Sequence, residues 1–293
     1  MNVVFATDRG YLQHLAVALA SLLENNSGMN IYIINNDISG ADWKKLGKLF
    51  AGKDSKLIDA KIDDRQIECL ITHSYFTKAM YYRLFIPDIV KGDRALYLDP
   101  DIVVTQRIDD LYNAEISNAF LAAVVNPGIY NNHDLGMGHS AKYFNSGVML
   151  INLEYWRSFN VKEKVIEFIG GSLGVVQFPD QDGLNSVING NWLELHPKYN
   201  MHTVFLCAEC AYVSPIKEAI DNPVIIHYTG SSKPWHFADH HPYKHLYWKY
   251  LRMTPYKFSI PSKPLNIISL KNIKWMIPKS IKDNLKKILR RKI

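Results

Sequence analysis

The sequence predicts an α/β fold built on a parallel sheet with helices on its faces. Two observations support this prediction. Short apolar runs alternate with segments of helical periodicity from the first residues onward, and this alternation is typical of parallel α/β sheets. Polar turns follow several of the apolar runs, and such sheets bind their ligands beyond the carboxyl ends of the strands.

The first 62 residues contain five elements in alternating order. The apolar runs at 2–6, 30–35 and 56–62 predict three buried strands. Leucines at helical spacing predict a helix over 13–25. A second helix over 39–50 begins at a serine that can cap it, with an acidic residue three positions later. The chain therefore opens as strand, helix, strand, helix, strand.

The later part of the chain continues this pattern less regularly. The expected strands are at 94–98, 120–125, 144–153 and 223–228, and the expected helices at 78–85, 154–169 and 184–188. Gly147 interrupts one strand, where a glycine permits close approach of the backbone to a ligand. The segment 129–143 is polar and rich in Gly, Asn and His, and we interpret it as a mobile loop or lid.

Two carboxylates interrupt the apolar stretch that begins at residue 94. Asp99, Pro100 and Asp101 follow a short buried strand, and apolar residues resume at Ile102. Charges in such a run are costly unless they are paired or bind a cation. Side chains at i and i+2 of a strand share a face, so both carboxylates can reach one hard cation such as Mg2+ or Mn2+. The alternative is a solvated Asp-Pro-Asp turn.

Neither glycine-rich nucleotide signature, GxGxxG or GxxxxGK[ST], is present, so other residues must hold any nucleotide. Asp8 follows the first predicted strand, where such sheets bind ligands. Taken alone, a turn-forming role explains Asp8 better. Arg83 lies in the predicted helix 78–85, and it either extends along the surface or reaches a phosphate or an acid.

A glycine- and serine-rich loop follows the last predicted strand. His227 ends that strand, and Gly230 and Lys233 lie in the loop, whose N–H groups and ammonium can bind phosphate. His227 is either a third ligand to a metal held by two Asp or a satisfied structural residue. Asp180 and Gln181 have local explanations as well, namely a helix N-cap and an exposed first-turn residue.

The composition is that of a folded globular protein, with 47% hydrophobic and 21% charged residues. No apolar run approaches the roughly 18–20 residues that span a bilayer. The first ten residues contain too short an apolar stretch for a signal peptide. Three cysteines do not make a disulfide framework. We therefore expect a cytoplasmic protein.

The positive charge is concentrated at the C-terminus. Residues 271–293 hold nine Lys or Arg and one Asp, so they carry +8 of a net charge of +6, and the other 270 residues sum to −2. An apolar stripe over 281–289 is flanked by Lys and Arg, as in helices that lie on anionic membranes. We expect 256–293 to be a basic, amphipathic membrane-association region. The alternative is a helix packed on the body; nucleic acid is disfavoured because the body is not basic.

Six segments occur in an order that resembles glycosyltransferase family 8, which includes bacterial lipopolysaccharide and lipooligosaccharide galactosyl- and glucosyltransferases. The segments are FATDRGY at 5–11, YYRL at 81–84, YLDPDIVV at 97–104, YFNSGVMLINL at 143–153, FPDQDGLN at 178–185 and HYTGSSKPWH at 227–236. The resemblance implies a GT-A-type, Rossmann-like catalytic domain over 1–255, with a mixed, mainly parallel sheet.

The resemblance also implies an activity. It is the retaining transfer of galactose or glucose from a UDP-sugar to a glycan or glycolipid acceptor, such as growing lipopolysaccharide or lipooligosaccharide core or another cell-surface glycan. The implied cofactor is Mn2+, with Mg2+ as an alternative. From the cysteine usage and the basic tail, we expect the protein at the inner face of the cytoplasmic membrane, with the tail as the peripheral contact.

Site residues are carried over by matching motifs. Asp99, Asp101 and His227 resemble the metal ligands, with Pro100 between the two acids. Ala6 and Asp8 resemble uridine contacts, and Gly230 and Lys233 a diphosphate-binding loop. The residues that resemble the donor-sugar pocket are Arg83, Asn126, Asn145, Asp180 and Gln181. Family members often carry Asp at the position of Asn126 and Asp or Asn at that of Gly10, so those two contacts differ here.

The route of retention has two forms, a covalent intermediate or a same-face displacement. Gln181 matches the nucleophile position best, but an amide is a poor nucleophile. We therefore favour the same-face route, in which Gln181 and Asp180 position the sugar and the departing phosphate accepts the proton.

Other functions are less well supported. Cys207 and Cys210, with His202 or the histidines at 236–245, suggest zinc, but a structural zinc site needs four ligands and the chain has no second CxxC. A non-catalytic sugar- or nucleotide-binding protein does not need the complete set of metal ligands. A metal-dependent nucleotidyltransferase or phosphatase leaves the segments at 143–153 and 178–185 unexplained.

Overall fold

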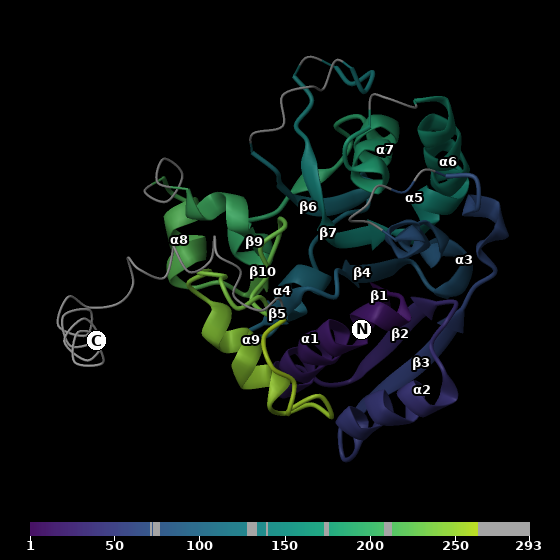
Figure 1. Ribbon diagram of the computed structural model, residues 1–293. Coiled ribbons are helices and arrows are strands. Elements are labelled where there is room, and N and C mark those ends of the chain that lie inside the picture. The colour runs from purple at the N-terminus through teal and green to yellow at the C-terminus, as the bar shows by residue number, and fades with distance from the viewer. Residues whose placement is uncertain are drawn as a thin grey trace, which may run out of the picture.

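The computed structural model describes residues 1–70, 72, 77–127, 134–138, 140–172, 176–207 and 213–262. Its strands form two sheets (Figure 1). The seven-stranded sheet has the order β3-β2-β1-β4-β7-β6-β8, and the three-stranded sheet the order β5-β10-β9. The strands are β1 (Asn2–Ala6), β2 (Met29–Asn35), β3 (Ser55–Lys61), β4 (Arg94–Leu98), β5 (Ile102–Val104), β6 (Leu121–Val125), β7 (Phe144–Asn152), β8 (Leu193–Glu194), β9 (Met201–His202) and β10 (Ile225–His227).

The large sheet is mixed and mainly parallel, which confirms the predicted fold class. Strands β1 to β4 pair in parallel, β7 runs antiparallel to both β4 and β6, and β8 is parallel to β6. From β1 the chain builds outward to β2 and β3 and then returns to place β4 on the other side of β1. This reversal makes a topological switch point at the carboxyl ends of β1 and β4, where open α/β sheets bind ligands.

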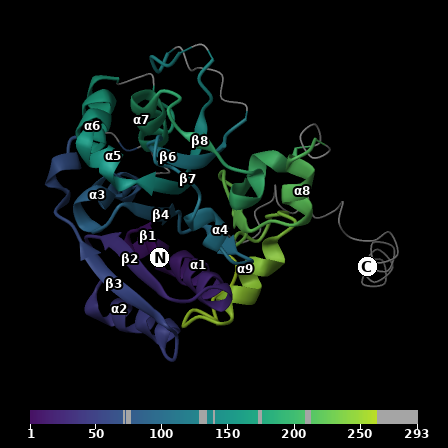
Figure 2. The ribbon, with the colours of Figure 1, turned by 180° about the vertical axis from the view of Figure 1, so that it is seen from behind.

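Helices cover both faces of the large sheet, as Figure 2 also shows from behind. The α-helices are α1 (Leu12–Asn25), α2 (Gly40–Gly47), α3 (Ile86–Ile89), α4 (Asp109–Tyr112), α5 (Leu153–Ser158), α6 (Val161–Gly171), α7 (Pro179–Ile188), α8 (Ile216–Asp221) and α9 (Lys244–Leu251). The 3-10 turns are η1 (Arg9–Tyr11), η2 (Lys48–Phe50), η3 (Asp64–Ile67), η4 (Lys78–Phe85), η5 (Pro197–Asn200) and η6 (Thr203–Leu206).

Alternating side chains of β1 enter two different cores. Val3 and Phe5 pack in the cluster that contains α1 and α2, whereas Val4 and Ala6 pack in the cluster that contains η4, α3 and α5 to α7. All four side chains are buried. A strand covered on both faces reads as a continuous apolar run, which explains why this element was visible in the sequence.

The small sheet stands against the end of the large one. Strand β10 pairs antiparallel with β5 and parallel with β9, so His227 faces Ile102 on one side and His202 on the other. Helix α9 packs in the same core cluster as Val103 of β5 and Ile226 of β10, together with Val17 of α1. The small sheet thereby places His227 of β10 beside Asp99, which follows β4 of the large sheet.

Three predicted helices differ in the structure. The helix expected at 154–169 is broken into α5 and α6 at Asn160, whose φ of +50° is left-handed. The segment 78–85 is a 3-10 helix rather than an α-helix. The helix expected at 184–188 already begins at Pro179, so it includes the acidic residues of the preceding motif. Helical periodicity in the sequence does not fix the residue at which such a helix starts or breaks.

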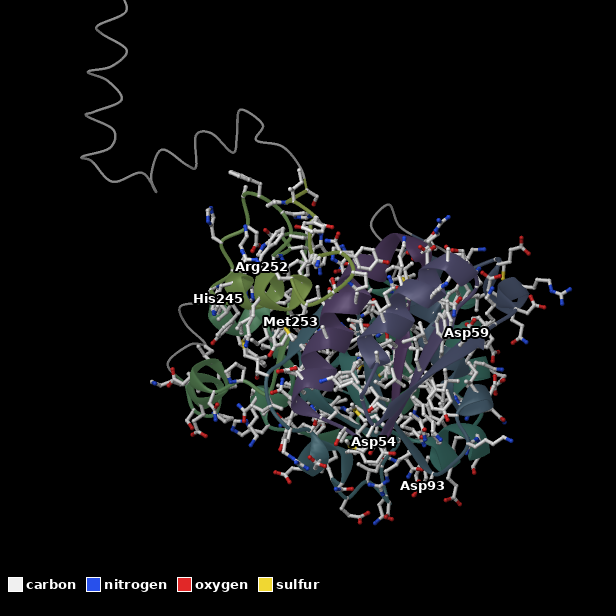
Figure 3. All side chains as sticks on the ribbon, turned by 90° about the horizontal axis from the view of Figure 1, so that it is seen from below. Asp54, Asp59, Asp93, His245, Arg252 and Met253 are labelled. Atoms are coloured by element: carbon white, nitrogen blue, oxygen red, sulfur yellow. The ribbon has the colours of Figure 1, made fainter. Side chains whose placement is uncertain are left out.

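The described chain ends near α9. His245, Arg252 and Met253 lie on the same side of the body (Figure 3). The backbone N–H of Phe237 donates to the carbonyl of Ser262. Among the described residues no helix has both the length and the apolar character to cross a bilayer. Residues 263–293 lie outside the described part, so the amphipathic helix over 281–289 and the region 256–293 stay predictions.

Candidate active site

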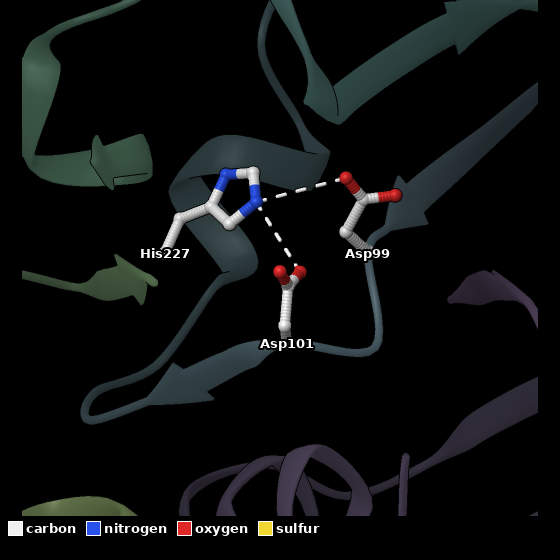
Figure 4. A group of neighbouring side chains, drawn as sticks. All are labelled: Asp99, Asp101 and His227. Carbon is white, nitrogen blue, oxygen red and sulfur yellow. Dashed lines mark ion pairs between the residues drawn. The ribbon is translucent and has the colours of Figure 1, made fainter. Parts of the chain in front are cut away.

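The turn 99–101 carries the chain from one sheet to the other. Asp99 follows β4 of the large sheet, and Asp101 precedes β5 of the small sheet. His227 ends β10, which pairs with β5. Their ligand atoms lie within 4.8 Å of one another (Figure 4), and among the described residues they form the one such group of three metal-ligating side chains. The predicted metal ligands are thus brought together.

The imidazole of His227 faces both carboxylates. Its Nε2 lies 3.3 Å from Oδ1 of Asp101 and 3.6 Å from Oδ2 of Asp99. Burial alone would raise the pKa of Asp101, but the neighbouring ammonium of Lys233 holds that pKa well below its usual value. Asp101 is therefore a carboxylate at neutral pH, as a metal ligand must be.

The other oxygen of each carboxylate is already engaged. Oδ1 of Asp99 accepts hydrogen bonds from Arg83 Nη2 at 2.8 Å and from the hydroxyl of Tyr97 at 2.6 Å. Oδ2 of Asp101 accepts from Lys233 Nζ at 2.6 Å. Each acid consequently offers one oxygen toward His227. Two carboxylate oxygens and an imidazole nitrogen are a donor set that suits Mn2+ and, with less preference for the nitrogen, Mg2+.

Gly147 of β7 lies directly behind this group. A Cβ built on Gly147 would stand 2.1 Å from Cε1 of His227 and 2.7 Å from Oδ2 of Asp99. Its carbonyl also accepts from the backbone N–H of Asp99 at 2.8 Å. The predicted close approach therefore exists, and within the protein it is an approach to the side chains of the predicted metal ligands.

Arg83 links this group to a second acid. Its guanidinium contacts Asp99 through Nη2 and, at 3.1 Å, Oδ2 of Asp180 through Nη1. The side chain is 6% exposed, so the surface alternative for Arg83 is wrong. Nη1 also donates to the carbonyl and hydroxyl of Ser146. Burial raises the pKa of Asp180 to about 6, although Arg83 opposes this rise.

Asp180 and Gln181 are buried in the first turn of α7, so the exposed first-turn reading of Gln181 is wrong. Phe178, not Asp180, occupies the N-cap position. Oε1 of Gln181 accepts from the backbone N–H of Ser146 at 3.0 Å, and its Nε2 donates to the hydroxyl of Tyr143 at 3.1 Å. The amide is therefore held at both ends.

The remaining predicted residues lie at or near the ends of strands. Ala6 ends β1. Asp8 caps η1 by accepting from the N–H of Tyr11, and it accepts from the hydroxyl of Thr77, which confirms its turn-forming role. Three further residues were assigned by motif: Asn126 donates its backbone N–H to the carbonyl of Tyr143, Asn145 lies in β7, and Gly230 has a φ of +86° that favours glycine.

Three polar residues around the site were not predicted. Tyr97 bonds Asp99, Tyr143 bonds Gln181, and Asn200 bonds His227 at 3.0 Å. Tyr97 had a signal in the sequence, because residues i and i+2 of a strand share a face. Asn200 had none, since it lies in the short turn η5 and belongs to no motif.

The zinc alternative has little support among the described residues. Cys207 is exposed, and the ring of His202 is buried and stacks on Phe205 with centroids 4.1 Å apart. Cys210 lies outside the described residues. Part of the predicted lid is described: Leu135 and Met137 are buried and cluster with Tyr143.

Comparison with known proteins places the chain in a family. A family model described as "Glycosyl transferase family 8" matches residues 2–239. General stress protein A of Bacillus subtilis is 32% identical over 269 residues, which cover 87% of this chain and 94% of that protein. Lipopolysaccharide 1,2-glucosyltransferase of Escherichia coli is 28% identical over 281 residues, covering 92% of this chain and 83% of that protein.

The fold has solved counterparts. The galactosyltransferase LgtC, determined in complex with donor and acceptor sugar analogues, superimposes with a TM-score of 0.76 at 22% identity. The match covers 89% of this chain and 98% of LgtC. The family match, the mixed sheet and the group of two acids with a histidine lead to one conclusion: the chain belongs to glycosyl transferase family 8 and is a glycosyltransferase with the GT-A fold.

Proposed function

We propose that this glycosyltransferase moves galactose or glucose from a UDP-sugar to a glycan or glycolipid acceptor of the cell surface, with retention of the anomeric configuration. The observation that carries the proposal is the junction at Asp99. One of its oxygens faces His227, and the other accepts from Arg83, which also holds Asp180. A metal-and-phosphate site and a sugar site would thus share one carboxylate. The activities named for the lipopolysaccharide enzyme and LgtC support the hexose class.

The residues present fit a divalent cation. Asp99 Oδ2, Asp101 Oδ1 and His227 Nε2 would hold it, and we assign Mn2+, with Mg2+ as the alternative, from this donor set. When bound, such an ion neutralises the charge that develops on a departing diphosphate. The low pKa of Asp101 keeps its carboxylate ready for this role without proton release.

Lys233 supplies a second positive charge on the phosphate side. Its Nζ lies 2.6 Å from both Asp101 Oδ2 and the carbonyl of Tyr228. The loop after β10 thereby stands beside the metal-binding turn. An ammonium and backbone N–H groups near Gly230 are suited to a diphosphate, because charge-assisted hydrogen bonds strengthen as negative charge accumulates.

On the sugar side, the structure favours positioning over covalent attack. Gln181 Oε1 is held by the N–H of Ser146, and Asp180 Oδ2 is paired with Arg83. In the proposed same-face route, the bond from the anomeric carbon to the phosphate oxygen breaks as the bond to the acceptor oxygen forms. The acceptor proton moves to the departing phosphate. Arg83, Asp180 and Gln181 hold the hexose in the orientation that this route needs.

The test is UDP release from a panel of UDP-hexoses, with Mn2+ or with EDTA. We expect one hexose to turn over in a metal-dependent manner and Asp101→Asn to abolish that turnover. Asp54→Asn, an exposed acid in a turn, is the matched control and keeps it. Turnover that is unaffected by EDTA and by Asp101→Asn would overturn the metal assignment. Tight UDP binding without turnover of any donor, even with cell-envelope glycan added, would favour a binding protein.

We also propose that the enzyme acts at the inner face of the cytoplasmic membrane. The basic tail predicted over 256–293 is one source of affinity. The last described residues add another: Phe258 is 86% and Ile260 82% exposed, beside the exposed Lys257. The sequence has no acidic residue over 240–262. Exposed apolar side chains among basic ones fit the headgroup region of an anionic bilayer.

A further inference from the structure

A chain of buried hydrogen bonds runs from a backbone N–H of β7 to the ring of His227. The N–H of Gly147 donates to Oδ1 of Asn145 at 3.0 Å. Nδ2 of Asn200 donates to the same oxygen at 2.8 Å. Oδ1 of Asn200 lies 3.0 Å from Nδ1 of His227. Asn145, Asn200 and His227 are each buried, and Asn200 has no exposed surface.

The donor and acceptor roles along this series of hydrogen bonds follow from its first donor, the backbone N–H of Gly147. A backbone N–H can only donate, so the side-chain atom of Asn145 that meets Gly147 must be its oxygen. The group of Asn200 that meets this oxygen must then be its NH2. The oxygen of Asn200 therefore faces His227, and an oxygen can only accept. Nδ1 of His227 must carry the proton.

We propose that Asn200 is a positioning residue that selects the tautomer of His227. A neutral imidazole carries one proton, so a proton on Nδ1 leaves Nε2 with a free lone pair. That nitrogen is the one that faces Asp99 and Asp101. A metal ligand must present a free lone pair, and the partner of the other ring nitrogen determines which nitrogen does so. This inference rests on the metal site of the proposed function.

The same series of hydrogen bonds joins the two sheets. Asn145 belongs to β7 of the large sheet, whereas His227 belongs to β10 of the small one, and Asn200 lies immediately before β9. These hydrogen bonds thereby tie the orientation of His227 to β7. The same strand also supports Asp99, whose backbone N–H donates to the carbonyl of Gly147. A second consequence concerns Asn145: its oxygen already accepts two hydrogen bonds, so only its NH2 group is left to bind a donor sugar.

The first test is direct. Long-range 1H–15N spectra of the full-length, metal-free protein, recorded at a pH where the His227 ring is neutral, report which of its two nitrogens is protonated, with His227→Asn providing the assignment. We expect the proton on Nδ1. A neutral ring with its proton on Nε2 of His227 would overturn the proposal, and the wild-type protein alone is enough to show it. This readout is independent of catalysis and of metal binding.

Two substitutions of Asn200 separate tautomer selection from packing. Asn200→Leu removes the acceptor, and we expect it to weaken Mn2+ binding about 10- to 100-fold, the range typical of such supporting partners. Asn200→Asp keeps an acceptor for His227, but it replaces the NH2 group with a second oxygen, which faces the oxygen of Asn145. The Asn200→Asp variant should lose thermal stability, but it should keep the proton on Nδ1 of His227 and the wild-type affinity for Mn2+. A purely structural role would lower Mn2+ affinity in both variants or in neither.

Asn222→Leu, which makes the same replacement at an exposed asparagine, is the matched control. Mn2+ affinity, read from the electron paramagnetic resonance signal of free Mn2+, should stay within a few-fold of wild type. Equal affinity in wild type and Asn200→Leu would overturn the proposal. Failure of wild type to bind Mn2+ at all would instead overturn the metal assignment, while the spectra would still decide the tautomer.

Discussion

Nζ of Lys233 lies 2.6 Å from Oδ2 of Asp101, on the side of that carboxylate opposite to His227. The contact joins the loop after β10 to the turn between β4 and β5 across 132 positions of sequence. One acid therefore carries a metal-facing oxygen and a lysine-facing oxygen. The proposed phosphate-binding loop and the proposed metal site therefore share one acid, and a change in either is expected to affect the other.

Lys233→Met should lower kcat/KM for the UDP-sugar by about 10²–10³, the loss typical when one donor to a developing oxyanion is removed. The methionine keeps the length of the side chain and removes its charge. Lys233→Arg keeps the charge and should lose less. Steady-state UDP release at saturating Mn2+ measures both variants. Wild-type activity in Lys233→Met would contradict the assigned role.

Gly147→Ala should abolish Mn2+ binding, because the new methyl group would overlap His227 Cε1 and crowd Asp99 Oδ2. Calorimetric titration with Mn2+ measures the effect, and thermal unfolding shows how far the fold is retained. Gly170→Ala is the matched control, since nothing lies within 4 Å of its built Cβ. It should bind Mn2+ as wild type does. Normal binding by Gly147→Ala would show that the site adapts in a way the structure does not indicate.

Asp180→Asn should change how stability depends on pH. Burial raises the pKa of Asp180 from 3.8 to about 6, so between these values the folded state binds more protons than the unfolded state. Stability from this group is therefore present at low pH and falls as pH rises toward about 6. Removing the carboxyl should remove this fall, which is at most about 1.4 kcal/mol per pH unit.

Urea unfolding in EDTA between about pH 4.5 and pH 7 measures the slope. Asp54→Asn, at an exposed turn position, should reproduce the wild-type slope. A slope in Asp180→Asn identical to wild type would mean that another group accounts for the proton uptake.

Rapidly quenched turnover should leave the enzyme unmodified. The two nearest candidates for attack, Gln181 and Asp180, are both occupied by protein partners, the N–H of Ser146 and the guanidinium of Arg83. Mass spectrometry of peptides spanning residues 177–185 gives the readout. A hexosyl group on either side chain would refute the same-face route and establish a covalent intermediate.

Deleting residues 265–293 should abolish co-sedimentation with vesicles that contain anionic lipid and leave UDP-sugar hydrolysis unchanged. Each Lys or Arg near such a surface contributes about 1 kcal/mol of binding free energy. In the full chain, replacing Phe258 and Ile260 together by Ser should weaken sedimentation without affecting hydrolysis, since both side chains are exposed. Sedimentation of the deleted chain equal to that of the full chain would refute the tail as an anchor.

Local patterns in the sequence were sufficient for much of the fold. A strand buried on both faces, such as β1, shows as an apolar run, and α1 shows as leucines at helical spacing. The two acids at 99 and 101 were visible because charge inside an apolar run is costly. These features are local, since they depend on neighbours within a few residues.

Local patterns could not show which distant residues are paired with one another. Arg83 lies in a short helical segment, and only the tertiary structure brings Asp180 to it over 97 positions of sequence.

The sequence by itself determined which residues can carry charge or bind metal and on which elements they lie. Only the tertiary structure decided how they are paired: Asp101 with Lys233, Asp99 with Arg83, and His227 with Asn200. The physical reason is that the strength of a hydrogen bond or ion pair depends on distance and burial. Both are set by the path of the whole chain, and no periodicity along the sequence records which distant residues that path brings together.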